Sequence, residues 1–145
     1  MINKALIITH KEDYTADFLI NKLNQRELSY KRLNCEDLSF KLYNINSSFN
    51  FRFESDENFS SVWFRRIKLP ILHDYKPEIQ FYLAHEYEVL LKNLFSILDC
   101  KWVSDPFMVY KAENKLLQLK EALKIGFNLP DTLITNSKEN LIDFY

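Results

Sequence analysis

The chain has 145 residues, of which 47% are hydrophobic and 27% are charged, and its formal net charge is -1. This size allows one domain with a real core, or one domain plus part of another. The charge balance excludes the basic surface of a nucleic-acid-binding domain and a polybasic membrane patch. No apolar run approaches the ~18 residues of a membrane span, and the N-terminal run is too short for a signal peptide. We expect a cytoplasmic protein.

The chain contains a single glycine, Gly126, and this excludes two glycine-rich phosphate-binding motifs. A P-loop or a dinucleotide-binding fingerprint needs several glycines, so that backbone N–H groups can approach phosphates. Cys35, Cys100 and the three histidines form no spacing typical of metal ligands. We therefore predict no metal site and no catalytic residue in this chain. The twenty Phe and Tyr rings are expected to fill a core rather than to stack on bases.

The first predicted elements form a strand–helix–strand unit. Residues 4–9 are a continuous apolar run, as expected of a buried strand. Asp13 is a suitable cap for a helix whose apolar positions recur at helical spacing. Residues 29–34 form the next strand. This order predicts a right-handed parallel crossover.

A β-hairpin is predicted next, from strands over residues 38–45 and 49–54. In the second strand Phe49, Phe51 and Phe53 alternate with polar residues, which predicts one buried face. Residues 61–66 form another short strand.

A long helix is predicted over residues 78–99, with Pro77 at its first position, where the missing N–H costs nothing. Trp102 and Val103 form a brief strand, and a domain boundary is expected within residues 104–109. A helix over residues 111–125 follows, with Lys115 in its first turn and Gly126 as its stop. Pro130 begins a strand, and Ser137 opens a last helix.

Arg65 and Arg66 are the first candidate site residues. Two arginines at a strand end, beside an aromatic ring, suit bidentate binding of a carboxylate or phosphate. Successive strand residues face opposite sides, however, so at most one of them would point into a cleft. The other would then meet a surface carboxylate.

Two further segments each allow two interpretations. Residues 32–38 follow a parallel strand at its carboxyl end, where open α/β sheets bind ligands, but Asn34 and Asp37 also suit a local turn. Lys115 lies where the helix dipole disfavours a positive charge, and a bound phosphate would relieve that cost. A solvated lysine balanced by Glu113 explains the same residues.

The order of these segments resembles the N-terminal portion of ATP-grasp peptide maturases, the microviridin-type and grasp-with-spasm enzymes. The segments span nearly the whole chain, and together they are more specific than any one alone. They are the opening strand and helix, residues 32–34, residues 61–66, Trp102-Val103 with Pro106, Asn114-Lys115 with Gln118-Leu119, and residues 126–136.

The resemblance implies an α/β fold, a small mixed sheet with flanking helices followed by the first elements of an ATP-grasp domain. Residues 1–106 would form the pre-ATP-grasp domain, and residues 107–145 the start of a truncated central domain. It also implies ligase chemistry on a precursor peptide with ATP and Mg²⁺, closing lactone or lactam rings through an acyl phosphate. Lys115 would contact the nucleotide phosphates, and Arg65 and Arg66 remain candidates for substrate or phosphate.

We expect this chain alone to be inactive and to bind neither ATP nor Mg²⁺ tightly. The alternative is a non-catalytic accessory module that binds a peptide or a partner subunit by its sheet edge. Apolar side chains of residues 116–133 are expected to be exposed, so self-association as a homodimer is a further expectation.

Overall fold

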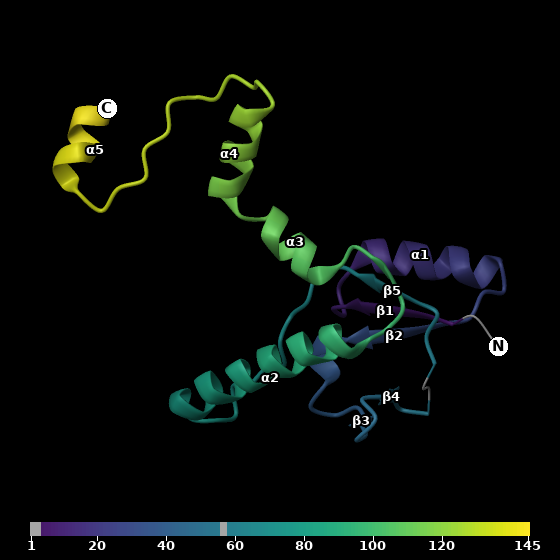
Figure 1. Ribbon diagram of the computed structural model, residues 1–145. Coiled ribbons are helices and arrows are strands. Elements are labelled where there is room, and N and C mark those ends of the chain that lie inside the picture. The colour runs from purple at the N-terminus through teal and green to yellow at the C-terminus, as the bar shows by residue number, and fades with distance from the viewer. Residues whose placement is uncertain (1–3, 56–57) are drawn as a thin grey trace. The chain divides into compact units, whose positions relative to one another are not determined.

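The computed structural model describes residues 4–55 and 58–145. The chain divides into two compact units, residues 1–106 and residues 107–145. The N-terminal unit carries the sheets and nearly all of the buried side chains, whereas the C-terminal unit consists of short helices and connecting segments (Figure 1).

A four-stranded parallel sheet forms the centre of the N-terminal unit, in the order β2-β1-β5-β6. Its strands are β1 Ala5–Thr9, β2 Tyr30–Asn34, β5 Ser61–Phe64 and β6 Lys101–Val103. The central strand β1 buries four consecutive residues, which explains its continuous apolar sequence. The predicted strands and their parallel crossover are confirmed.

Two helices cover this sheet, α1 (Tyr14–Gln25) and α2 (Pro77–Ile97), and they lie on opposite faces of it (Figure 1). Asp13 caps α1 as predicted, and Pro77 occupies the first turn of α2. The inner side of α2 buries Leu91, Leu94 and Phe95.

Aromatic rings fill the contact between α2 and the sheet. Phe95 lies edge-on to Phe64, with ring centroids 5.3 Å apart, and edge-on to Trp102 at 6.1 Å. Such geometries add about 0.5–1.5 kcal/mol per pair to the gain from burial. The rings of these three residues therefore serve as core, as the composition predicts.

The hairpin is shorter than predicted and forms a separate antiparallel sheet. Its strands are β3 Tyr43–Ile45 and β4 Phe51–Phe53, and residues 38–42 precede the first of them. Leu38 instead ends a short 3₁₀-helix, η1 (Cys35–Asp37). Phe51 and Phe53 are buried as expected, but Phe49 is exposed because its φ of 59° places it in the turn.

The C-terminal unit contains α4 (Lys115–Lys124) and α5 (Lys138–Phe144), and α3 (Pro106–Ala112) leads into it. The single helix predicted over residues 111–125 was wrong, because Asn114 interrupts it and caps α4 by accepting the Leu117 N–H at 3.0 Å. The strand expected after Pro130 was also wrong: residues 130–135 pair with no other strand in the described part of the chain.

Gly126 ends α4 as predicted. Its φ of 86° lies in the left-handed region that glycine adopts without strain, and its N–H donates to the Leu123 carbonyl. The Phe127 N–H donates to the Ala122 carbonyl, so the last turn is closed. Ser137 caps α5, as the sequence indicates.

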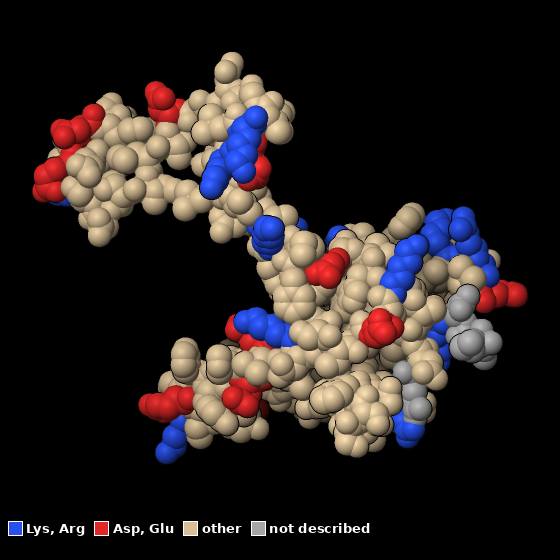
Figure 2. All heavy atoms as spheres, viewed as in Figure 1, with Lys and Arg blue, Asp and Glu red and all other residues tan. Residues whose placement is uncertain are grey.

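The surface carries both signs of charge, separated by wide uncharged areas on the face that Figure 2 shows. Many large apolar side chains are exposed, including Leu116 and Leu123 of α4. Among the described helices, none combines the length and the apolar character that crossing a membrane would require.

We predict that Leu94→Asp destabilises the N-terminal unit by several kcal/mol, because Leu94 is buried against the sheet and the new charge would have no partner. Urea denaturation followed by circular dichroism measures this. Glu88→Ala is the control on the same helix, since its contact with Lys92 is long and exposed, and we expect a change within ~0.5 kcal/mol. Equal stabilities for the two variants would contradict the assignment of the buried face.

Candidate functional site

The carboxyl edge of the parallel sheet is the candidate site. From β1 the chain passes through α1 to β2 on one side, and from β5 it passes through α2 to β6 on the other. The connections of two neighbouring strands therefore diverge at this edge. In open α/β sheets, ligands bind in the crevice at such a point. Thr9 ends β1 here, His10 directly follows it, and Arg65 directly follows β5.

Asp13 is the centre of this edge, and its side chain is 5% exposed. Its Oδ2 accepts a hydrogen bond from Thr9 Oγ1 at 2.6 Å and another from Arg65 Nε at 3.3 Å. Its Oδ1 accepts the N–H groups of Thr15 at 3.0 Å and Ala16 at 3.2 Å. One carboxylate thus joins the end of β1, the start of α1 and the residue after β5.

These contacts keep Asp13 ionised. Burial raises the pKa of Asp13, but hydrogen bonds from Thr9, the Ala16 N–H and Arg65 outweigh it and hold the pKa at about 2. The carboxylate therefore remains a fixed negative partner for the guanidinium of Arg65 at neutral pH.

Arg65 is half-buried, with 31% of its side chain exposed. Its guanidinium carbon lies 5.4 Å from the centre of the Trp63 ring, and its backbone N–H donates to the Ile8 carbonyl at 3.0 Å. Only Nε bonds to Asp13, and the two Nη groups make no hydrogen bond to any described residue. Arg65 therefore presents a fixed, planar pair of donors, which suits a carboxylate or a phosphate.

Arg32 holds the loop after β1 from the other side. Its Nη2 donates to the carbonyls of His10 at 2.7 Å and Lys11 at 3.0 Å, and its Nη1 pairs with Asp17 of α1. Its Nε donates to Asn34 Oδ1 at 2.7 Å. Four of the five N–H donors of Arg32 are thereby directed at this loop and its neighbours, so its role is to shape the edge.

Charged side chains of both signs surround the edge. Lys11 Nζ contacts Asp37 at 2.6 Å, and Lys68 Nζ contacts Glu12 at 2.5 Å. Two buried atoms of the edge, His10 Nδ1 and Glu36 Oε2, have no hydrogen-bond partner among the described residues. The other oxygen of Glu36 accepts the Lys11 N–H at 3.1 Å.

The predicted site residues lie in different surroundings. Arg65 faces the edge, whereas Arg66 is exposed. Asn34 donates to Asp37 at 3.3 Å, which is the local turn that one interpretation of residues 32–38 proposed. Lys115 is exposed in the C-terminal unit, and its Nζ contacts Gln118 Oε1 at 3.3 Å.

The sequence predicted Asp13 only as a helix cap, and it did not single out Thr9 or His10, whereas Glu36 lies within the candidate segment of residues 32–38. The available signal was their position, since each lies at or just after the carboxyl end of a predicted parallel strand. Within the described ranges, no three His, Cys, Asp or Glu side chains form a group that could hold a metal ion.

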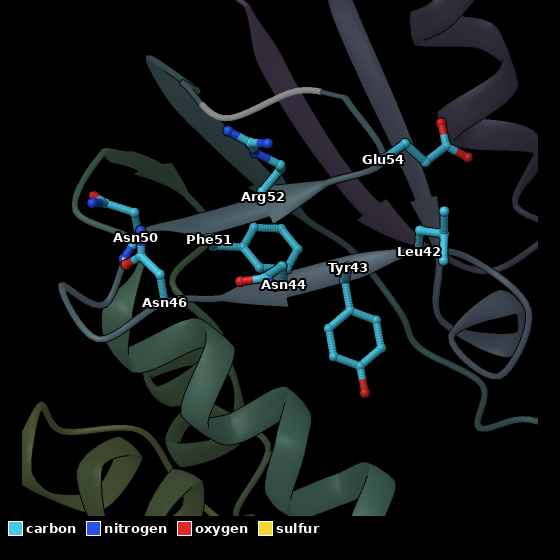
Figure 3. Close-up of a pocket in the computed structure, with 8 residues that line it drawn as sticks. All are labelled: Leu42, Tyr43, Asn44, Asn46, Asn50, Phe51, Arg52 and Glu54. Carbon is cyan, nitrogen blue, oxygen red and sulfur yellow. The ribbon is translucent and has the colours of Figure 1, made fainter.

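A hollow of about 450 Å³ lies elsewhere, at the β3–β4 hairpin. Figure 3 shows Arg52 and Tyr43 pointing to opposite sides of the hairpin, as alternation along paired strands requires. Glu54 at its end accepts hydrogen bonds from Lys31 and Lys41, which lower the pKa of Glu54 to about 2. The hollow combines polar contacts but carries no pair of side chains typical of catalysis.

Comparison with solved structures reveals what this architecture is similar to. The macrocyclase MdnB from Microcystis aeruginosa MRC matches 98% of this chain and 50% of its own length, with 25% identity and a TM-score of 0.81. The macrocyclase MdnC from the same organism, bound with precursor peptide MdnA, matches 97% of this chain and 50% of its own length, with 18% identity and a TM-score of 0.85.

A Chryseobacterium gregarium RiPP-associated ATP-grasp ligase, in complex with ADP and a leader and core peptide, matches 98% of this chain and 47% of its own length. Its identity is 24% and its TM-score is 0.74. No protein-family model matches the chain, and no curated protein matches it.

The fold is thus that of peptide-modifying ATP-grasp ligases, and the resemblance to their N-terminal portion is confirmed. The chain spans about half the length of the solved structures that it matches.

We predict that the buried charge of Asp13 makes the stability of the fold depend on pH. Its folded pKa of about 2 lies below the ordinary 3.8, so its stabilising effect is complete above about pH 4 and is lost as the pH falls toward 2. This difference between the folded and the ordinary pKa corresponds to about 2 kcal/mol of unfolding free energy.

Urea denaturation of the wild type and of Asp13→Asn between pH 2 and pH 6 measures this effect. The variant keeps the side-chain shape and all other carboxylates. The difference in unfolding free energy between wild type and variant should therefore be largest near pH 6 and should shrink as the pH falls. A gap that does not change with pH would show that the charge of Asp13 does not stabilise the fold.

Proposed function

We propose that this chain forms the N-terminal half of an ATP-dependent ligase that modifies a ribosomally made precursor peptide. The observation that carries the proposal is the match of 98% of the chain to the macrocyclase MdnB. Solved structures of the same fold contain precursor peptides or ADP, which supports a peptide substrate and ATP for the whole enzyme.

The proposed reaction activates a side-chain carboxylate of the peptide as an acyl phosphate, which a hydroxyl or an amine then attacks. The product is a lactone or lactam ring within the peptide. Stabilising the charged groups in such a reaction requires preorganised cationic donors. We propose that this chain is inactive alone and contributes only part of these donors.

Arg65 is the donor that we assign to the peptide substrate. Its Nε is held by Asp13 and its plane lies near Trp63, so its two Nη groups have a fixed orientation. A planar fork of this kind binds a carboxylate or a phosphoryl group bidentately. In the proposal, Arg65 orients the peptide carboxylate at the carboxyl edge of β1 and β5.

Lys115 is the residue that we assign to the nucleotide phosphates. It occupies the first turn of α4, where an anion is favoured and a lone positive charge is not. Its present contact with Gln118 is exposed and long, so little is lost when a phosphate replaces it. The Mg²⁺ that assists such chemistry finds no ligand cluster in the described ranges, and we assign it no residue.

We predict that Arg65→Ala in the full-length ligase lowers kcat/KM for the precursor peptide by about 10- to 100-fold, the equivalent of one lost charge-assisted hydrogen-bond pair. The KM for ATP should not change. Asp13 keeps its three other donors, so the fold should persist, and the melting temperature checks this. Arg66→Ala is the matched neighbour and should have little effect. If Arg66→Ala impairs peptide use more than Arg65→Ala, the assignment is wrong.

Lys115→Ala in the same enzyme should impair the use of ATP and leave the use of the peptide unchanged. We expect the KM for ATP to rise, because the enzyme loses about 1–3 kcal/mol of binding free energy for ATP. Peptide recognition and the melting temperature should stay unchanged. Lys120→Ala, on the same helix but beyond its first turn, serves as the control. Unchanged ATP kinetics would identify Lys115 as an ordinary solvated lysine.

A further inference from the structure

His10 and Glu36 each leave one buried atom without a partner at the carboxyl edge. His10 directly follows β1, and Glu36 lies in η1, directly after the strand β2 that pairs with β1. Neither His10 Nδ1 nor Glu36 Oε2 has a hydrogen-bond partner among the described residues. Leaving a buried polar atom unpaired costs free energy, so two such atoms at one edge call for an explanation.

The two unpaired atoms belong to neighbouring and complementary groups. The other oxygen of Glu36, Oε1, accepts the backbone N–H of Lys11 at 3.1 Å, and Lys11 is bonded to His10. The Glu36 carboxylate therefore lies within one peptide unit of His10. An imidazole Nδ1–H is a donor and a carboxylate oxygen is an acceptor, so each atom supplies what the other lacks.

Nε2, the second ring nitrogen of His10, lies in different surroundings. It makes no hydrogen bond within the described part of the chain, and unlike Nδ1 it is not buried. The backbone of His10 is held in place, because its carbonyl accepts a hydrogen bond from Arg32 Nη2 at 2.7 Å. The half-buried ring thus has one nitrogen inside the edge and one that is open to a ligand.

Charged groups from several elements surround this ring. Glu36 comes from η1, and Glu12 comes from the loop before α1, where Lys68 contacts it at 2.5 Å. The hydrogen bond from Lys68 is the main cause that lowers the pKa of Glu12, and the charge of His10 adds to this effect. The other charged side chains here pair with one another: Lys11 with Asp37, Arg32 with Asp17, and Arg65 with Asp13. Glu36 keeps one oxygen that can orient the imidazole.

His10 and Arg65 end neighbouring strands. β1 and β5 are parallel, with Ile8 opposite Phe64, so His10 and Arg65 both follow their strands at the same edge. Arg65 is the residue that we assign to the peptide carboxylate. A group of the peptide that attacks this carboxylate after its activation would therefore arrive beside His10.

We propose that His10 is the general base for the attacking hydroxyl or amine of the peptide, and that Glu36 is its positioning residue. This inference rests on the proposed ligase function and deepens it. As the oxygen or nitrogen of the nucleophile bonds to the carbonyl carbon of the acyl phosphate, Nε2 accepts its proton. The bond from that carbon to the phosphate oxygen breaks, phosphate leaves with the electron pair, and the imidazolium passes its proton to water.

Glu36 has its role at the moment when the ring becomes positively charged. Its Oε2 then accepts the Nδ1–H of His10, which holds the ring with Nε2 toward the nucleophile. Catalytic hydrogen bonds of this kind often form fully only when the substrate is bound, which explains why both atoms are unpaired without it.

Hydroxylamine trapping separates this step from formation of the acyl phosphate. Hydroxylamine is a neutral amine near pH 7, so it attacks an acyl phosphate without a general base and yields a hydroxamate. In the full-length ligase with precursor peptide, ATP and Mg²⁺, His10→Gln should slow ring closure about 100-fold or more. Formation of hydroxamate on the peptide should stay unchanged. His85→Gln, the same substitution at an exposed position of α2, is the control and should change neither rate.

Two further measurements distinguish a base from a merely structural residue. Ring closure by the wild type should slow as the pH falls below neutral, because a protonated imidazole cannot accept a proton, and His10→Gln should lack this dependence. Glu36→Gln keeps an oxygen for the Lys11 N–H and should slow ring closure less than His10→Gln does. The double variant should be no slower than His10→Gln alone, because the two residues act as a unit.

The outcomes separate this inference from the function on which it rests. Unchanged ring closure in His10→Gln would overturn it. An equal loss of hydroxamate would also overturn it, because His10 would then act before the attack or in the fold, which the melting temperature decides. A wild-type ligase that forms no hydroxamate would instead contradict the proposed ligase reaction, and the role of His10 would fall with it.

Discussion

The arrangement of the N-terminal unit depends on the hydrogen bonds that the buried carboxylate of Asp13 accepts. It accepts hydrogen bonds from the end of β1, from the first turn of α1 and from the arginine after β5. A charge that is 5% exposed is tolerated because several hydrogen-bond donors surround it. The carboxylate that caps α1 through Oδ1 therefore also joins the carboxyl ends of two adjacent parallel strands through Oδ2.

This constraint explains why the carboxyl edge is the part of the unit best suited to bind a substrate. Asp13 accepts a hydrogen bond from Nε of Arg65, and the two Nη groups of Arg65 stay available for a ligand. On the opposite side, Arg32 donates to the carbonyls of His10 and Lys11. A site whose cation is already oriented loses little entropy when an anion binds. The edge is thus rigid where the proposed ligase needs a fixed cation.

Local signals in the sequence were sufficient for most of the fold. The apolar run of β1, the Asp13 cap, Pro77 and Gly126 each act within a few residues, and each was predicted correctly. The pairing of Asp13 with Arg65 joins residues 52 positions apart, so no local pattern contains it. Only the rule that parallel strands end at one edge places the two residues together.

The errors have physical causes of the same kind. Phe49 fits the alternation of a strand, but the chain must reverse direction there, and the residue adopts a positive φ instead. The helix predicted over residues 111–125 satisfied the apolar period, yet the Asn114 side chain competes for the backbone N–H groups and starts a new helix. Residues 130–135 have the composition of a strand, but a strand requires a neighbour with which to pair.

The most direct test of the proposed function is ADP release in the presence of ATP, Mg²⁺ and a precursor peptide. It should be measured for this 145-residue polypeptide and for a full-length ligase that contains it. The account predicts release at background for the polypeptide alone and peptide-dependent release for the full-length ligase. Protein-dependent ADP release by the polypeptide alone, or none by the full-length protein, would contradict it.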